Sequence, residues 1–166
     1  FRVAGIFSVG HYEYASGLAL VRLEDAQALY RLGEAASGVR LPTRGVCLLS
    51  VRDRDKEGAV VIAKRLSARG FEIVATQGTA ATLEAAGIPC RRALKVREGR
   101  PHIVDMIKND EIDLIVNTTE GKRAIHESRS IRREAEYRRV TYYTTVAAAH
   151  ATCDALDHLD DHDVNR

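Results

Sequence analysis

The sequence predicts an α/β domain with three layers, in which helices cover both faces of a five-stranded, mostly parallel sheet. The first observation is that short apolar runs, typical of strands buried on both faces, alternate five times with longer helical patterns between residues 46 and 159. Strands that alternate with helices in this way favour parallel pairing. The second is composition: 45% of the 166 residues are hydrophobic, which is enough for a sizeable core. Because only 5% are aromatic and Trp is absent, that core must be aliphatic.

The predicted strands differ in their expected place in the sheet. Residues 46–51 and 113–118 are apolar almost throughout and predict buried strands. Charges interleave with the apolar residues of 90–96, which is typical of an edge strand. The full set of predicted strands is 46–51, 71–76, 90–96, 113–118 and 140–145.

The predicted helices are recognised by apolar stripes and by their ends. Asp53, Asp55 and Glu57 follow the first strand and suit a helix start, through capping and through the helix dipole. Gly70 and Gly87 are typical of helix ends. The five predicted helices lie at residues 53–70, 78–86, 103–109, 125–139 and 146–159.

The two ends of the chain differ from this body. Residues 1–43 contain a helical stretch at about 23–36 and a linker that ends in Leu41-Pro42-Thr43, and we expect a remnant of a preceding domain there. Residues 44–153 are expected to form the α/β domain, and residues 154–166 an acidic tail. The chain opens with Phe and has the character of a piece of a longer protein.

Charge and cysteine usage exclude several classes of protein. The 25 basic and 23 acidic side chains give a net charge of +2, so nothing global points to nucleic acid or a membrane as a partner. No apolar run approaches the roughly 20 residues of a membrane span. Cys47, Cys90 and Cys153 are far apart and show no CxxC spacing, which indicates reduced thiols in a cytoplasmic protein.

Polar residues gather where the predicted strands end. In an open parallel sheet, ligands bind beyond the carboxyl ends of the strands. Hydroxyls, amides and lysines suit an anion, and the turn 76–79 opens a helix whose free N–H groups and dipole favour a phosphate. The alternative is that the lysines are solvated surface charges and the threonines only close turns. The candidate residues at the strand ends are Ser50, Lys56, Thr76, Gln77, Gly78, Thr79, Lys95, Asn117, Thr118, Thr119, Thr144 and Thr145.

Three further candidates carry weaker signals. His158 and His162 have the spacing of helical metal ligands, but no third ligand is recognisable, so an exposed helix end is favoured and no metal site is expected. Cys47 lies inside a buried strand and is expected to fill the core. His102 stands near a helix start, where donation to an anion and a capping or packing role are equally open.

Several motifs resemble the carboxyl-terminal domain of the carbamoyl phosphate synthase large subunit, in the same order along the chain. They are residues 49–56 (LSVRDRDK), 70–80 (GFEIVATQGTA), 95–103 (KVREGRPHI), 117–124 (NTTEGKRA) and 128–133 (SRSIRR). The similarity runs from about Gly45 to Cys153. It implies a methylglyoxal-synthase-like fold that acts as the allosteric domain of the synthase.

The resemblance also implies a ligand, partners and site residues. The family domain binds UMP as an inhibitor and IMP as an activator, in pyrimidine and arginine biosynthesis. Thr144 matches an interface position where ornithine binds in some members. The family's nucleotide contacts all fall on residues that the strand ends also single out: Ser50, Lys56, Thr76, Thr79, Lys95, Asn117 and Thr119. The implied partners are the remaining synthase domains, which use ATP and Mg, and the glutaminase small subunit. No cofactor is expected in this chain, and which effector dominates stays open.

The alternative with the same fold is methylglyoxal synthase, a lyase acting on dihydroxyacetone phosphate. That chemistry needs aspartate bases near the substrate. Where that family carries aspartates, this chain has Arg100-Pro101 and Asn117-Thr118-Thr119, which have no useful basicity. The sequence therefore favours a binding domain without chemistry of its own.

Overall fold

The structure is a computed structural model that describes residues 42–162. Side chains are described for this range except at residues 122, 123 and 158–162. The helical stretch predicted within residues 1–43 therefore lies outside the described residues, as do the side chains of His158 and His162.

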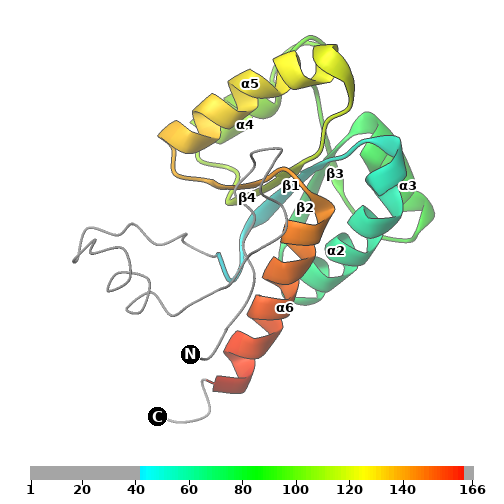
Figure 1. Ribbon diagram of the computed structural model, residues 1–166, viewed down its shortest axis with the longest axis vertical. Coiled ribbons are helices and arrows are strands. Elements are labelled where there is room, and N and C mark those ends of the chain that lie inside the picture. Colours follow the sequence, from blue (N-terminus) through cyan, green and yellow to red (C-terminus); the bar gives the residue numbers. More distant parts are fainter. Residues whose placement is uncertain (1–41, 163–166) are drawn as a thin grey trace.

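Five strands form one sheet with the order β3-β2-β1-β4-β5 (Figure 1). Every neighbouring pair is parallel, so the prediction of a five-stranded, mostly parallel sheet is confirmed. β1 is central because its apolar residues are buried on both faces. The strands are β1 (Val46–Ser50), β2 (Glu72–Thr76), β3 (Arg91–Ala93), β4 (Leu114–Asn117) and β5 (Thr141–Tyr143).

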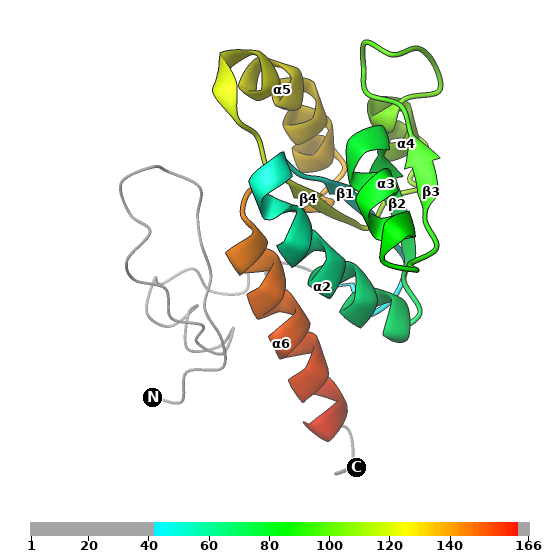
Figure 2. The same cartoon turned by 90° about the vertical axis from the view of Figure 1, so that its right-hand side faces the viewer.

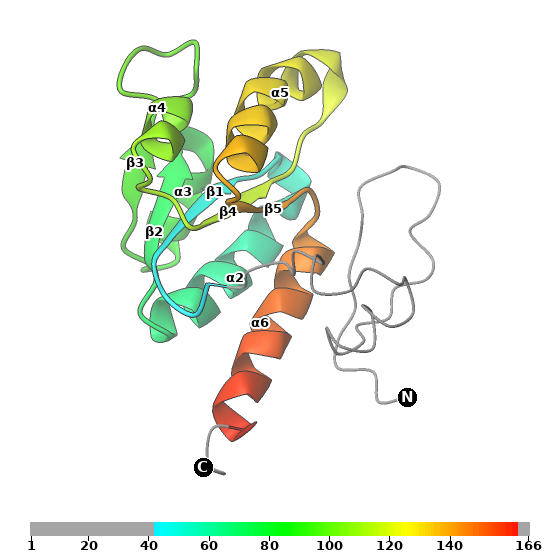
Figure 3. The ribbon, with the colours of Figure 1, turned by 90° about the vertical axis from the view of Figure 1, so that its left-hand side faces the viewer.

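Helices cover both faces of this sheet, which confirms the three-layer prediction (Figures 2 and 3). α2, α3 and α6 pack on one face, and α4 and α5 on the other. No helix in the described range has both the length and the apolar character needed to cross a membrane. The helices are the short 3-10 helix η2 (Asp53–Asp55), α2 (Lys56–Ala68), α3 (Gln77–Ala85), α4 (Ile103–Lys108), α5 (Gly121–Tyr137) and α6 (Val146–His162).

The central strand shows how the core is divided. Successive side chains of a strand point to opposite faces. Cys47 and Leu49 accordingly pack with α2, α3 and α6, whereas Leu48 packs with α4 and α5. All three side chains are fully buried. Burial also raises the pKa of the Cys47 thiol far above its ordinary value, as expected of a core side chain that is not a nucleophile.

Two element ends differ from the expectations. β3 ends at Ala93 rather than near Val96, because Lys95 enters a turn in which its N–H donates to Glu98 Oε2 at 2.8 Å. The expected capping by Asp53 and Asp55 is wrong, since neither carboxylate caps the helix start. Asp55 instead accepts a hydrogen bond from Arg52 Nε at 2.7 Å.

The last helix continues beyond residue 153, where the acidic tail was expected to begin. Leu156 is fully buried in the core. Asp154 Oδ1 lies 2.7 Å from Arg65 Nη2, and Asp157 forms ion pairs with both Arg65 and Arg69 of α2. The first acidic residues of the expected tail thus attach α6 to α2.

The contact between α2 and α6 predicts the effect of replacing Gly58 with alanine. A Cβ at Gly58 would lie 2.5 Å from Val146 Cγ1, and the β-branched valine has little freedom to move aside. We expect the free energy of unfolding to fall by about 1–3 kcal/mol. Urea unfolding followed by circular dichroism measures this change.

The matched control is Gly78→Ala at the start of α3. Its Cβ would meet only Lys56 Nζ, at 3.8 Å, which is an ordinary contact. We expect no loss of stability there, because alanine favours the helix over glycine by about 0.5–1 kcal/mol. Equal losses in the two variants would contradict the close helix contact.

Candidate functional site

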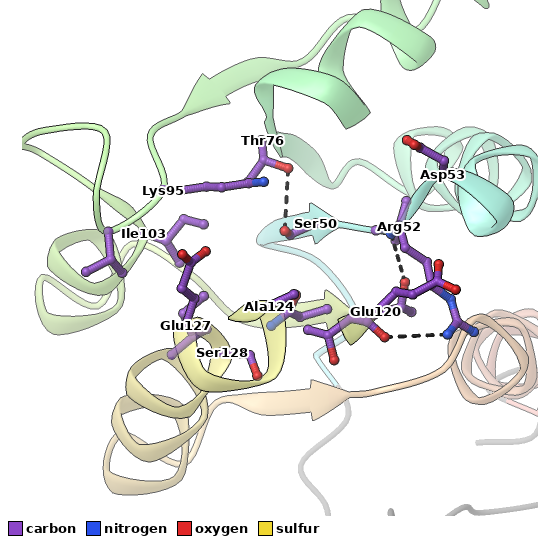
Figure 4. A pocket seen from close by; sticks show the side chains of 16 residues that line it. Ser50, Arg52, Asp53, Thr76, Lys95, Ile103, Glu120, Ala124, Glu127 and Ser128 are labelled. Atoms are coloured by element: carbon purple, nitrogen blue, oxygen red, sulfur yellow. Dashed lines mark hydrogen bonds between the residues drawn. The ribbon is translucent and has the colours of Figure 1, made fainter. Parts of the chain in front are cut away.

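The cavity at the carboxyl ends of β1 and β4 is the candidate site. From β1 the chain proceeds outward to β2 and β3 in one direction and to β4 and β5 in the other, so strand order reverses between β1 and β4. Ligands of open parallel sheets bind at such a point. The cavity has a volume of about 400 Å³ and is lined by the ends of β1, β2 and β4, by the segments that follow β1, β3 and β4, and by α5 and the start of α4 (Figure 4).

Hydroxyl groups form one side of the cavity. Thr76 Oγ1 lies 3.4 Å from Ser50 Oγ and 3.5 Å from Thr79 Oγ1. These are long, weak hydrogen bonds, so the hydroxyls of Ser50 and Thr76 can turn to a ligand at little cost. Thr79 is buried and its Oγ1 accepts a hydrogen bond from the Val51 N–H at 3.2 Å. Thr79 therefore fixes the segment after β1 and does not line the cavity itself.

The start of α3 adds backbone donors beside these hydroxyls. Thr76 is the N-cap residue and has extended backbone, but its side chain makes no capping hydrogen bond. The first N–H groups of α3, at Gln77 and Gly78, are therefore not satisfied by a cap. Gly78 has no side chain that would keep a ligand away from them. Such a helix start attracts anions.

Two lysines supply positive charge near the start of α3. Lys95 lines the cavity and extends towards Thr76 (Figure 4), and its ammonium forms no ion pair with any described residue. Lys56 Nζ lies 2.8 Å from Asp53 Oδ1 and close to Gly78, beside the cavity rather than in its lining. The hydrogen bond and charge of Lys56 lower the pKa of Asp53, which therefore stays ionised at neutral pH.

A network around Arg52 joins the two segments that leave β1 and β4. The Arg52 N–H donates to Thr118 Oγ1 at 3.1 Å, and Arg52 Nη1 donates to the Thr119 carbonyl at 3.5 Å. The Thr118 N–H donates in turn to the Ser50 carbonyl at 3.0 Å. Arg52 also lines the cavity, and sequence reasoning missed it because it stands in a charged run that is typical of a solvated surface.

The opposite wall of the cavity comes mainly from α5. The residues of this wall were not identified from the sequence as part of the site. Apolar side chains of this wall include Val96, Ile103 and Ile131. Glu127 of α5 also faces the cavity, and Arg97 Nε lies 3.5 Å from its Oε1. The spacing of the α5 residues is that of a single helix face, which is the signal that could have identified them: Ala124, Glu127, Ser128 and Ile131.

Asn117 and Thr119 reach the cavity from the end of β4. Asn117 is buried and its Nδ2 donates to Tyr142 Oη at 2.7 Å. Thr144 follows β5 and does not line the cavity. Of the predicted residues, the structure brings together Ser50, Thr76, Lys95, Asn117 and Thr119, with Lys56 and Thr79 directly behind them.

His102 takes the capping role that the sequence left open. It is the N-cap residue of α4, and its Nδ1 accepts a hydrogen bond from the Asp105 N–H at 3.3 Å. Asp105 Oδ2 accepts from the His102 N–H at 3.1 Å, and this bond lowers the pKa of the Asp105 carboxyl. The described part of the chain contains no group of three or more His, Cys, Asp or Glu side chains that could hold a metal ion.

The arrangement suits binding of a phosphorylated ligand better than proton transfer. Hydroxyls, N–H groups and a lysine without an ion pair among the described residues form one side, and the facing wall presents apolar side chains beside Glu127. Of the three carboxylates that line the cavity, Asp53 is paired with Lys56, which lowers its pKa and makes it a weak base, Glu127 lies 3.5 Å from Arg97, and Glu120 is exposed.

Comparisons with known proteins give the family context. The model of the MGS-like domain family matches residues 58–144. The chain is 51% identical over 139 residues to the carbamoyl phosphate synthase large chain of Ralstonia nicotianae, covering 83% of this chain and 13% of that protein. It is 56% identical over 116 residues to the large chain of Pseudomonas putida, covering 70% of this chain and 11% of that protein.

Solved structures show the same fold at lower sequence identity. Methylglyoxal synthase from Elizabethkingia anophelis superposes with a TM-score of 0.55 and 19% identity, over 68% of this chain and 79% of that one. At this level of identity the likeness concerns the fold alone.

Proposed function

The chain belongs to the MGS-like domain family, and from this premise we propose that it is the allosteric domain of a carbamoyl phosphate synthase large subunit that binds a nucleoside monophosphate. One observation carries the proposal: the strand-end cavity combines groups suited to phosphate on one side with a wall on the other that presents Val96, Ile103 and Ile131. Because the chain spans only 13% and 11% of the length of the two relatives, the synthase reaction itself belongs to the rest of such a protein.

The phosphate is placed at the start of α3. There the uncapped N–H groups of Gln77 and Gly78 and the hydroxyls of Ser50 and Thr76 provide hydrogen-bond donors. Lys95 provides the positive charge, and no ion pair with a described carboxylate has to break before it binds the phosphate. Hydrogen bonds to charged groups contribute about 1.5–3 kcal/mol each, so these groups together can hold a phosphate monoester.

The nucleoside is placed between the hydroxyl side and the α5 wall. Val96, Ile103 and Ile131 offer apolar surface to a base, and Asn117 and Thr119 offer polar groups to a ribose or base edge. A volume of about 400 Å³ lies in the range of pockets that hold small ligands. Free phosphate would not require such a wall.

The regulatory effect follows from linkage. UMP is proposed as the inhibitor and IMP as the activator, each stabilising a different state of the synthase. Coupling energies of this kind are about 1–3 kcal/mol, which modulates activity without abolishing it. The partners are proposed to be the remaining synthase domains, with their ATP and Mg, and the glutaminase small subunit; Thr144 is proposed to face that interface, near ornithine.

Calorimetric titration of the chain with UMP, IMP and inorganic phosphate tests the proposal. Saturable binding of UMP or IMP, tighter than binding of phosphate alone, supports it. Turnover of dihydroxyacetone phosphate is measured in parallel, because methylglyoxal formation would establish the alternative lyase activity. A folded chain that binds neither nucleotide would contradict the proposal.

A further inference from the structure

The hydrogen bond between Asn117 and Tyr142 joins the nucleotide cavity to the neighbouring strand. Asn117 stands at the end of β4 and lines the cavity, whereas Tyr142 lies on β5 and does not. The Asn117 Nδ2 donates to Tyr142 Oη at 2.7 Å, which is a short hydrogen bond for an amide donor. In this arrangement the Nδ2 end of the amide points to Tyr142, which does not line the cavity.

The other end of this amide opens on the cavity. Asn117 Oδ1 accepts no hydrogen bond from any described residue. In the described range, every side-chain oxygen or nitrogen that is fully buried has a hydrogen-bond partner. Because Asn117 Oδ1 has none, it must be accessible, and the space next to it is the cavity that Asn117 lines. An amide carbonyl oxygen accepts hydrogen bonds and cannot donate one.

Tyr142 is itself held in place. Its ring packs against the cluster on the α4 and α5 face, and the Arg132 guanidinium of α5 lies 5.7 Å from the ring centroid. Burial raises the pKa of the Tyr142 phenol, so its hydroxyl stays neutral well above physiological pH. The tyrosine is therefore a fixed partner for the Asn117 amide.

We propose that Tyr142 is a positioning residue that orients the Asn117 amide, so that Asn117 Oδ1 accepts a hydrogen bond from a hydroxyl or N–H of the nucleoside. This inference rests on the proposed function. An acceptor at this point offers nothing to a fully ionised phosphate, and it favours ligands that carry a donor group beyond their phosphate. Tyr142 thus contributes to selection of a nucleoside monophosphate over inorganic phosphate.

The test is a double-mutant cycle with Tyr142→Phe and Asn117→Ala, titrated with UMP and with inorganic phosphate. Tyr142→Phe is expected to weaken UMP binding by about 3- to 10-fold, the effect of one hydrogen bond, and to leave phosphate binding unchanged. Because Tyr142 acts through Asn117, the double variant should bind UMP as Asn117→Ala does alone.

The matched control is Tyr143→Phe. Tyr143 is the next residue of β5 and points to the other face, where it packs with α6 and its hydroxyl interacts with Thr152. Removal of the Tyr143 hydroxyl should leave UMP affinity unchanged. In nuclear magnetic resonance spectra of the free chain, the side-chain amide signals of Asn117 should move in Tyr142→Phe and stay in place in Tyr143→Phe.

Three outcomes would overturn the inference: UMP affinity unchanged in Tyr142→Phe, equal losses for UMP and phosphate, or additive losses in the double variant. A parent chain that binds phosphate but shows no preference for UMP would also overturn it. A parent chain that binds neither ligand would overturn the proposed function, and this inference with it.

Discussion

Replacing Lys95 with alanine is expected to weaken UMP binding by about 10- to 100-fold. The Lys95 side chain extends into the cavity beside Thr76, and its ammonium has no carboxylate partner in the described part of the chain. Its whole charge is thus available to a ligand phosphate, and a hydrogen bond between charged groups is worth about 1.5–3 kcal/mol. Calorimetric titration of the variant with UMP measures the loss.

The control for this substitution is Lys64→Ala. Lys64 is an exposed lysine of α2 that does not line the cavity, so its removal changes the net charge equally. UMP affinity should stay within about twofold of the parent, since exposed charges outside the site are screened by salt. If both variants lost affinity equally, the effect would be one of net charge and the Lys95 contact would be disproved.

The Leu49→Ala variant is expected to lose about 2–5 kcal/mol of unfolding free energy. Leu49 is fully buried on the central strand, where it packs against α2, α3 and α6. Truncation leaves a cavity that neighbouring strands on both sides prevent from collapsing. Because β1 also carries Ser50 into the site, we expect UMP binding to be lost at lower urea concentrations than in the parent.

Urea unfolding followed by far-ultraviolet circular dichroism suits this measurement, because the chain has no Trp to report by fluorescence. Val61→Ala provides the comparison: Val61 is 47% exposed on α2 and its truncation should cost less than about 0.5 kcal/mol. A Leu49→Ala variant no less stable than Val61→Ala would be incompatible with a packed central strand.

The fold could be predicted because the sequence patterns of individual strands and helices agree with the positions that these elements occupy in the packed structure. The apolar runs around Leu48 and Ile115 became β1 and β4, two interior strands of the sheet, and both residues are fully buried. Gly70 and Gly87 follow helix ends with positive φ, 86° and 74°, as expected of residues that leave a helix. The charges of Arg91 and Arg92 placed β3 at the edge of the sheet.

The site was predictable only where it follows the strand ends. Parallel strands bring their carboxyl ends together, so Ser50, Thr76 and Asn117 had to be neighbours. Which face of α5 meets the cavity depends on how the helix packs, and its residues were therefore missed. Likewise, the sequence could not show that Thr79 turns inward to Val51, since a hydroxyl at a helix start serves a ligand or the backbone equally well.

Chemical-shift mapping of UMP binding by nuclear magnetic resonance on the isotope-labelled chain is the direct test of the strand-end nucleotide site. We expect the largest backbone amide shifts at the start of α3 and just after β4, at Gln77, Gly78 and Thr119. A second cavity at the opposite end of the sheet is lined by Arg44, Arg138 and Arg139. Shifts confined to that cavity, or no shifts at saturating UMP, would contradict the strand-end nucleotide site.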